Sequence, residues 1–453
     1  MTSRAATRAP HWFGTDGIRA RFGEEPLVEG TVRRLGRALG EEIFATGRAP
    51  RVVLGGDTRA STPVLERWLA EGLGAAGVTA IDLGVFPTAG VSWLVPRRGA
   101  ACGIVVSASH NPAADNGIKL VDGNGGKWRP ADELALERRL ASTPDPGPLA
   151  RPRREPDSEA AAAYLAWLAE AAGSLSLAGR RVALDAANGA ASRFAARLFA
   201  ALGAEVVHLH DAPDGDNINR DCGSLHPQDL QRAVASGGAD FGFAFDGDAD
   251  RVLLVDERGE LRDGDALLYL WASELARRGG LEPREIVATS MSNLGLERAL
   301  AARGIGVVRC GVGDRAVVAT LRERGLRLGG EQSGHLVDLA TSPTGDGLLT
   351  AVILAAVLVR DGRPASLQLA DFRRYPQLLV GVPVRAKPPL DSLPGVAAAA
   401  REVERRLGAD GRLVLRYSGT EPLARIMLEG PDGDLLRSLS DRLAAEIRAA
   451  IGA

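Results

Sequence analysis

The chain alternates short Val/Ile/Leu runs with Ala-, Leu- and Arg-rich segments of helical period from about residue 50 to residue 360. The run RVVLGGD at 51–57 is typical of a buried strand. Ser61, Thr62 and Pro63 supply a cap and a first-turn proline for a helix beginning with VLERWLAEGL. Because such alternation is typical of strands joined by crossover helices, the sequence predicts an α/β protein.

The length of the chain predicts several domains. Its 453 residues are about three times the ~150-residue size expected of one domain. The stretch 143–158 contains five prolines and is typical of an exposed boundary. The last 85 residues carry a different strand–helix pattern. We therefore expect three similar mixed α/β domains followed by a smaller α+β C-terminal domain, with bounds at 1–154, 155–257, 258–368 and 369–453.

Composition limits the partners and the location. The net charge is −2 and both signs are mixed along the chain, which argues against nucleic acid or an anionic membrane as a partner and favours a small ligand. The start lacks a secretory pattern, and the longest apolar stretch, 347–359, is shorter than the ~18 residues that span a bilayer. Cys102, Cys222 and Cys310 are odd in number and far apart, which predicts reduced, buried thiols in the cytoplasm.

The sharpest local signal is FDGDADR, in which Asp246, Asp248 and Asp250 follow an apolar strand. Two unit charges ~4 Å apart repel by about 4 kcal/mol at an effective dielectric of ~20, so three convergent carboxylates need a cation. Oxygen ligands favour a hard divalent metal. An acidic turn between two strands is the alternative. A calcium loop is excluded because Arg251 stands where that loop requires glycine.

A second signal is GIVVSASHNPAADNGIKL at 103–120, where an apolar strand runs into a small polar turn. Ser109 in this turn can act as a covalent group carrier, and Lys119 is near enough in sequence to neutralise an anion or move a proton. An ordinary capped turn explains the string equally well, with His110 as a structural hydrogen-bonding residue.

Two further polar strings lie in the second half of the chain. LGGEQSGH offers Glu331, Ser333 and His335 to sugar hydroxyls or an amine, with a polar loop as the alternative. RYSGTEPLAR offers an anion nest for a phosphate, with a surface hairpin turn as the alternative; the nest would be built from Arg416, Ser418, Gly419, Thr420 and Arg425.

The order and spacing of these four strings resemble the α-D-phosphohexomutase superfamily over nearly the whole chain. The resemblance implies that Ser109 carries a phosphoryl group and that Mg²⁺ is held by this phosphoserine together with Asp246, Asp248 and Asp250. It also implies that the GEQSGH loop contacts the sugar, that the RYSGTEP loop holds the distal phosphate, and that the fourth domain closes over the substrate.

Further segments narrow the resemblance to the superfamily's phosphoglucosamine mutase branch: FGTDGIR (13–19), ALDAANGAA (183–191), NINRDCGSLHP (217–227), SMSNLGLE (290–297), VGDR (312–315), TGDGL (344–348) and YPQ (375–377). This branch implies interconversion of glucosamine 6-phosphate and glucosamine 1-phosphate through a 1,6-bisphosphate, in bacterial amino-sugar supply for the cell wall. Arg19, Lys119 and Arg251 are expected to balance charge at the transferring group, and Lys119 or His335 to handle the hydroxyl proton.

Three other functions compete with this interpretation. A phosphomannomutase/phosphoglucomutase uses the same chemistry on another hexose, a non-catalytic sensor binds the sugar phosphate without turnover, and a phosphatase uses Asp246 as its nucleophile. The sequence leaves the oligomeric state open, a homodimer included.

Overall fold

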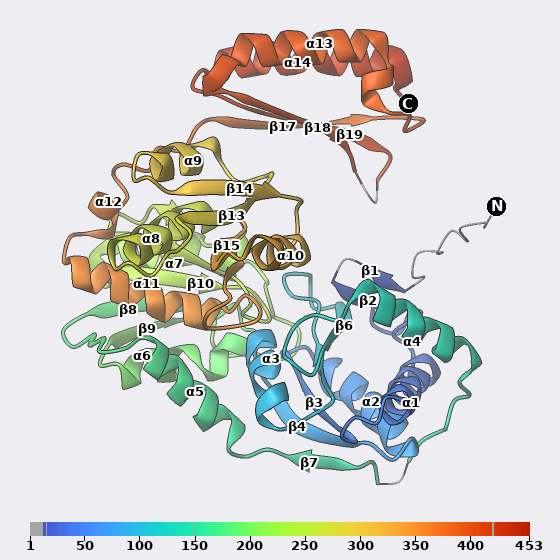
Figure 1. Ribbon diagram of the computed structural model, residues 1–453. Coiled ribbons are helices and arrows are strands. Elements are labelled where there is room, and N and C mark those ends of the chain that lie inside the picture. The colour runs from blue at the N-terminus through green and yellow to red at the C-terminus, as the bar shows by residue number, and fades with distance from the viewer. Residues whose placement is uncertain (1–11, 15, 150, 419–420) are drawn as a thin grey trace.

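The computed structural model describes residues 12–14, 16–149, 151–418 and 421–453. It contains three mixed or parallel-rich α/β units and a C-terminal α+β module (Figure 1). The predicted fold class is confirmed, whereas the exact domain bounds stay predictions. No helix in the described ranges is long and apolar enough to cross a membrane.

The first unit is built on a seven-stranded sheet of order β1-β2-β6-β5-β3-β4-β7. Strands β3, β4, β5 and β7 run parallel, and β6, β2 and β1 pair antiparallel at one end. The strands are β1 Phe13–Gly14, β2 Gly17–Arg21, β3 Arg51–Gly56, β4 Thr79–Val85, β5 Cys102–Val106, β6 Asp115–Val121 and β7 Arg154–Pro156. The helices are α1 Glu29–Ala45, α2 Thr62–Ala75, α3 Thr88–Arg97 and α4 Pro130–Ser142.

Helix α2 forms in the predicted segment but begins at Thr62, two residues before the predicted run VLERWLAEGL, with Pro63 in its first turn. The predicted cap is wrong for Ser61, whose side chain makes no capping bond. The Ser61 backbone is already helical, with φ −77° and ψ −20°, and its Oγ accepts a hydrogen bond from Asn116 Nδ2 at 2.8 Å.

The second and third units follow on two smaller sheets, of order β12-β11-β10-β8-β9 and β14-β13-β15-β16. The second holds β8 Arg181–Asp185, β9 Glu205–Leu209, β10 Phe241–Phe245, β11 Val252–Val255 and β12 Leu261–Arg262, with α5 Ala160–Ala171, α6 Ala195–Ala201 and α7 Gln228–Ala233. The third holds β13 Glu285–Thr289, β14 Gly306–Cys310, β15 Leu328–Gly330 and β16 Leu336–Asp338, with α8 Gly264–Arg277, α9 Leu294–Ala301, α10 Asp314–Arg324, α11 Gly347–Asp361 and α12 Ala365–Gln368.

The C-terminal module matches the predicted strand and helix order. Its antiparallel sheet β17-β19-β18 carries two helices on one face (Figure 1). The elements are β17 Gln377–Pro383, α13 Pro394–Leu407, β18 Arg412–Tyr417, β19 Leu423–Glu429 and α14 Gly433–Ile451. Its apolar residues form a cluster of their own, separate from the cluster that joins the first, second and third units.

All three cysteines are free, as predicted. Cys102 and Cys222 are buried, but Cys310 is only partly buried, so the predicted burial is wrong for that residue.

Candidate active site

Ser109 lies in the turn that follows the buried strand β5. Its side chain is 1% exposed, and its backbone has a φ of +51°, in the left-handed region that non-glycine residues rarely adopt. The Ser109 hydroxyl donates a hydrogen bond to Asp246 Oδ2 at 2.7 Å, and the Ser109 amide donates to Ser107 Oγ at 2.9 Å. The chain therefore brings the predicted phosphoryl carrier into contact with the predicted metal site.

The three aspartates follow β10 and converge as predicted. One oxygen from each of Asp246, Asp248 and Asp250 lies within 4.8 Å of the others, and all three residues are buried. Burial, reinforced by the two neighbouring carboxylates, raises the pKa of Asp246 well above its usual range. Asp248 Oδ1 and Asp250 Oδ1 are buried without a hydrogen-bond partner among the described residues. An all-oxygen donor set with unpartnered oxygens fits a hard divalent cation.

Lys119, on β6, lies against this acidic cluster. Its Nζ is 2.8 Å from Asp248 Oδ2, 3.0 Å from Asp16 Oδ2 and 3.9 Å from Asp250 Oδ2. Burial alone would lower the pKa of Lys119, but the three carboxylates raise it above its usual value. The lysine is therefore a fixed positive charge beside the serine and the aspartates.

Two arginines and a histidine border the serine. Arg19 is held by Asp16 at 2.7 Å, and Arg251 Nη1 lies 3.2 Å from His110 Nδ1. The same His110 nitrogen is 3.1 Å from Ser109 Oγ. Burial, followed by the charges of Arg251 and Arg19, lowers the pKa of His110 to about 4. His110 is therefore neutral at pH 7 and, with its proton on Nε2, accepts from Arg251.

The loop between β15 and β16 contributes the residues predicted to contact the sugar. His335 Nδ1 lies 3.5 Å from Asp250 Oδ2, and Glu331 accepts a hydrogen bond from the Gly313 amide at 2.8 Å. Ser333 is exposed in this loop. Burial opposes the charge on His335, but Asp250 raises its pKa to about 9 overall. The imidazole fits because Gly345 has no Cβ, which would collide with the ring.

Several of these residues line a cavity of ≈ 360 Å³ between the first, second and third units. The buried residues Ser109, Lys119, Asp246 and Asp248 are not among its lining residues, but they contact or neighbour those that are. The lining includes five predicted residues, namely Arg19, Asp250, Arg251, Glu331 and His335, and also His110, Asp16 and Asp314. Lys127 forms ion pairs with both Asp16 and Asp314, and so links the first unit to the third beside the cavity.

Of the predicted phosphate-binding residues in the C-terminal module, the three that the structure describes do not line this cavity. Ser418 Oγ lies 3.3 Å from Glu421 Oε2, and Arg425 pairs with the same carboxylate at 2.5 Å. Arg416 lies on the same hairpin. Gly419 and Thr420 fall outside the described residues. The β18–β19 hairpin extends from the module toward the rest of the molecule (Figure 1).

Sequence reasoning missed two residues that hold the serine turn. The carbonyl oxygens of Ser109 and Asn111 both accept from Arg59 Nη2, at 3.2 and 2.6 Å. Both also accept from Asn219 Nδ2, at 2.9 and 3.1 Å. Asn219 belongs to the NINRDCGSLHP segment that supports the family resemblance, so the sequence marked its position. Nothing in the sequence indicated that its side chain supports the serine turn.

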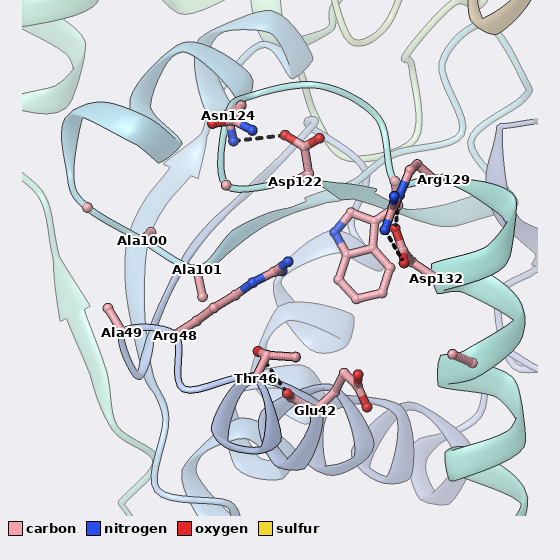
Figure 2. A pocket seen from close by; sticks show the side chains of 14 residues that line it. Glu42, Thr46, Arg48, Ala49, Ala100, Ala101, Asp122, Asn124, Arg129 and Asp132 are labelled. Atoms are coloured by element: carbon pink, nitrogen blue, oxygen red, sulfur yellow. Dashed lines mark hydrogen bonds and ion pairs between the residues drawn. The ribbon is translucent and has the colours of Figure 1, made fainter.

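A larger hollow of ≈ 740 Å³ lies elsewhere on the first unit, near the end of α1 (Figure 2). It is lined by Arg48, Asp122, Asn124 and Arg129 among others, and by none of the predicted site residues. The convergence of serine, carboxylates and lysine makes the smaller cavity the candidate active site.

Comparison with known proteins agrees with this geometry. Four domains of one family, described as phosphoglucomutase/phosphomannomutase, match the chain: alpha/beta/alpha domain I at 10–145, domain II at 162–259, domain III at 263–375 and the C-terminal domain at 379–446. A phosphoglucosamine mutase of Anaeromyxobacter dehalogenans is 44% identical over 97% of this chain and 99% of its own. One of Alkalilimnicola ehrlichii is 44% identical, with 97% of both chains covered.

The chain belongs to the phosphoglucosamine mutase family. This membership confirms the predicted resemblance and the predicted enzyme class, a phosphohexomutase.

Solved structures show the same fold as this member of the phosphoglucosamine mutase family. A phosphoglucomutase/phosphomannomutase family protein from Burkholderia thailandensis superposes with a TM-score of 0.80 at 28% identity, covering 97% of both chains. An N-acetylphosphoglucosamine mutase from Aspergillus fumigatus, solved in complex with GlcNAc-6P and magnesium, gives a TM-score of 0.68 at 20% identity, covering 99% of this chain and 97% of that one. The second likeness speaks for the fold alone.

Proposed function

We propose that this enzyme interconverts glucosamine 6-phosphate and glucosamine 1-phosphate, with Ser109 as the phosphoryl carrier. The observation that carries the proposal is the 2.7 Å contact between Ser109 Oγ and Asp246, in a buried cluster that also holds Asp248 and Lys119. A phosphoryl group on a serine beside three carboxylates is repelled by them unless cations offset the negative charge. We take glucosamine phosphate as the substrate from the names of two relatives that are 44% identical to this chain.

Asp246, Asp248, Asp250 and an oxygen of phosphorylated Ser109 are the groups that would hold Mg²⁺. The unpartnered oxygens of Asp248 and Asp250 and the all-oxygen donor set support this assignment. When bound, the ion supplies positive charge that offsets the phosphoryl group and the aspartates.

The chain's own cations complete the charge balance. Lys119, Arg19 and Arg251 stand around Ser109 and the aspartates, where phosphoryl transfer needs electrostatic stabilisation and in-line positioning. His110 accepts from Arg251 at 3.2 Å and so orients the guanidinium beside Ser109 Oγ.

Lys119 and His335 are both protonated at pH 7 in this structure, because their pKa values are raised. In each transfer the hydroxyl that accepts the phosphoryl group loses a proton, and the oxygen that gives up the phosphoryl group gains one. We therefore propose that one of these two protonated side chains gives its proton to the leaving oxygen and is reprotonated by the attacking hydroxyl in the same transfer.

The bisphosphate formed in the first transfer must turn end for end before Ser109 recovers a phosphoryl group. Glu331 and Ser333 are proposed to contact sugar hydroxyls in either orientation. The phosphate that is not reacting would be held by the C-terminal module, through Arg416, Ser418, Gly419, Thr420 and Arg425.

This role requires the C-terminal module to move toward the cavity. Two observations support such a movement: the module has an apolar core of its own, and hydrogen bonds join it to the third unit. Arg412 donates to the Ser292 carbonyl at 2.9 Å, and Gln377 donates to the Met291 carbonyl at 3.2 Å. Closure over the substrate would exclude water and limit hydrolysis.

The test is turnover of glucosamine 6-phosphate with Mg²⁺ and a catalytic amount of glucose 1,6-bisphosphate, beside parallel glucose and mannose assays. We expect a clear preference for glucosamine, abolished by Ser109→Ala. A preference for another hexose would move the enzyme to the phosphomannomutase/phosphoglucomutase alternative. Binding without turnover of any sugar would favour a sensor. The cytoplasmic location, the lack of a nucleic-acid partner and a homodimer stay predictions.

A further inference from the structure

A second cluster of ligand-type side chains lies in the second unit, outside the active-site cavity. Asp185 ends β8, His210 follows β9, and Cys222 precedes the short turn 223–225. One ligand atom from each of the three lies within 4.8 Å of the other two. The phosphotransfer mechanism uses none of them.

The imidazole of His210 is placed as metal-ligating histidines are. Its Nε2 is 3.2 Å from Asp229 Oδ2, which can take the ring proton. Its Nδ1 is 3.1 Å from Asp185 Oδ2, yet is buried and not aligned to form a hydrogen bond with it. The contact with Asp185, together with Asp229, raises the pKa of His210, so the two carboxylates favour a positive charge on or beside this ring. A cation between Nδ1 and the Asp185 oxygen would take the place of the ring proton there. A carboxylate on the far nitrogen is the usual second partner of a metal-bound histidine.

Cys222 completes the group with a buried sulfur. The residue is 1% exposed. Its Sγ accepts a long contact from Asn188 Nδ2 at 3.9 Å, and the described residues offer no acceptor for the thiol hydrogen. Asp185 itself is fixed, because its two oxygens accept from the amides of Ala187 and Gly223, both at 2.9 Å.

We propose that Asp185, His210 and Cys222 form a binding site for a thiophilic divalent cation of the Zn²⁺ class. On binding, the Cys222 thiol and Nδ1 of a protonated His210 release their protons to solvent, and the sulfur, Nδ1 of His210 and a carboxylate oxygen become ligands. Sulfur and nitrogen donors select Zn²⁺ over Mg²⁺, and three protein ligands leave a fourth position for water. This metal preference distinguishes the site from the all-oxygen cluster of Asp246, Asp248 and Asp250.

The site also lies close in sequence to the serine turn. Asn219, three residues before Cys222, holds the carbonyl oxygens of Ser109 and Asn111. A bound ion would therefore tie the ends of β8 and β9 to the segment that supports the phosphoryl carrier.

The test uses Co²⁺ as the spectroscopic probe on the full-length protein, with Mg²⁺ in excess and a non-chelating reductant. We expect one equivalent of Co²⁺ to produce a thiolate-to-cobalt charge-transfer band that Zn²⁺ displaces. Cys222→Ser should abolish the band, and Asp229→Asn should weaken binding by roughly 10- to 100-fold.

Matched controls keep the test specific. Cys102→Ser and Cys310→Ser replace the other two thiols, and Asp248→Asn alters the aspartate cluster; all three should retain the band. If Cys222→Ser does not fold, Asp185→Asn, whose amide oxygen can still accept from one of the two backbone amides, should still weaken Co²⁺ binding. Absence of the band in the wild-type protein, or its persistence in Cys222→Ser, would overturn the proposal and leave a hydrogen-bonded His–Asp pair.

Discussion

Asn219→Gly is the substitution that most sharply probes how the serine turn is held. Asn219 has a φ of +57°, so alanine would add backbone strain, whereas glycine adopts this conformation freely and removes only the side-chain amide. The change deletes two hydrogen bonds, of 2.9 Å to the Ser109 carbonyl and 3.1 Å to the Asn111 carbonyl.

The expected size of the effect follows from these two bonds. Each is worth about 1 kcal/mol net, so the loss is at most about 2 kcal/mol. Arg59 still donates to both carbonyls, which keeps the turn partly held. If the two bonds stabilise the transition state of phosphoryl transfer but not the enzyme–substrate complex, their loss lowers kcat by roughly 5- to 30-fold.

Steady-state kinetics with glucosamine 6-phosphate measure the effect of Asn219→Gly. We expect kcat to fall and KM to change little. Asp221→Gly is the matched control, since Asp221 is exposed, has a φ of +53° and belongs to the same segment. An unchanged kcat in Asn219→Gly, or an equal loss in Asp221→Gly, would refute the positioning role.

Three further predictions concern the metal site, a buried histidine and a buried hydrogen bond. Asp248→Asn should lower kcat by about 10²–10³-fold and weaken Mg²⁺ binding measured by titration calorimetry; unchanged Mg²⁺ affinity would contradict its role as a ligand. In metal-free protein, the pKa of His335 is raised to about 9, so its stabilising effect is complete below the usual ~6.5 and is lost as pH rises through about 9. The free energy of unfolding in urea should fall by up to about 3 kcal/mol over that pH interval, and His335→Gln should flatten its pH dependence. An equally steep pH dependence in the variant would exclude this residue as the cause. Tyr164→Phe removes a 2.7 Å bond to Asp346, which caps α11, and should reduce the free energy of unfolding by about 1–3 kcal/mol in the same assay; unchanged stability would show that this bond contributes nothing net.

The parts of the site predicted from sequence are those whose geometry is local. Asp246, Asp248 and Asp250 are neighbours in one loop after a buried strand, so they are close in space because they are close in sequence. The turn that brings their oxygens together, with Ala249 at a φ of +57°, is not specified by the alternate spacing. The apolar strand before Ser109 likewise predicts a serine in a turn at the end of a strand.

The remaining parts depend on contacts between distant segments. Arg59 and Asn219 reach the Ser109 carbonyl across 50 and 110 residues, and no local pattern specifies such a pairing. The pKa of His110 is lowered by burial and by Arg251 and Arg19, which only the folded chain brings near.

The C-terminal hairpin shows a different limit. The string around Arg416 and Arg425 predicts a phosphate-binding loop, yet in the structure Arg425 pairs with Glu421 and the described residues of the hairpin do not line the cavity. A sequence pattern can indicate which groups meet a substrate, but it does not specify the conformation in which the free protein holds them.

The central claim is that Ser109 carries the phosphoryl group. The direct measurement is peptide mapping by mass spectrometry after incubation with glucose 1,6-bisphosphate and Mg²⁺, before and after a chase with excess glucosamine 6-phosphate. The account predicts a phosphoryl group on Ser109 that the chase removes. A modification on Asp246, or turnover with an unmodified Ser109, would contradict it.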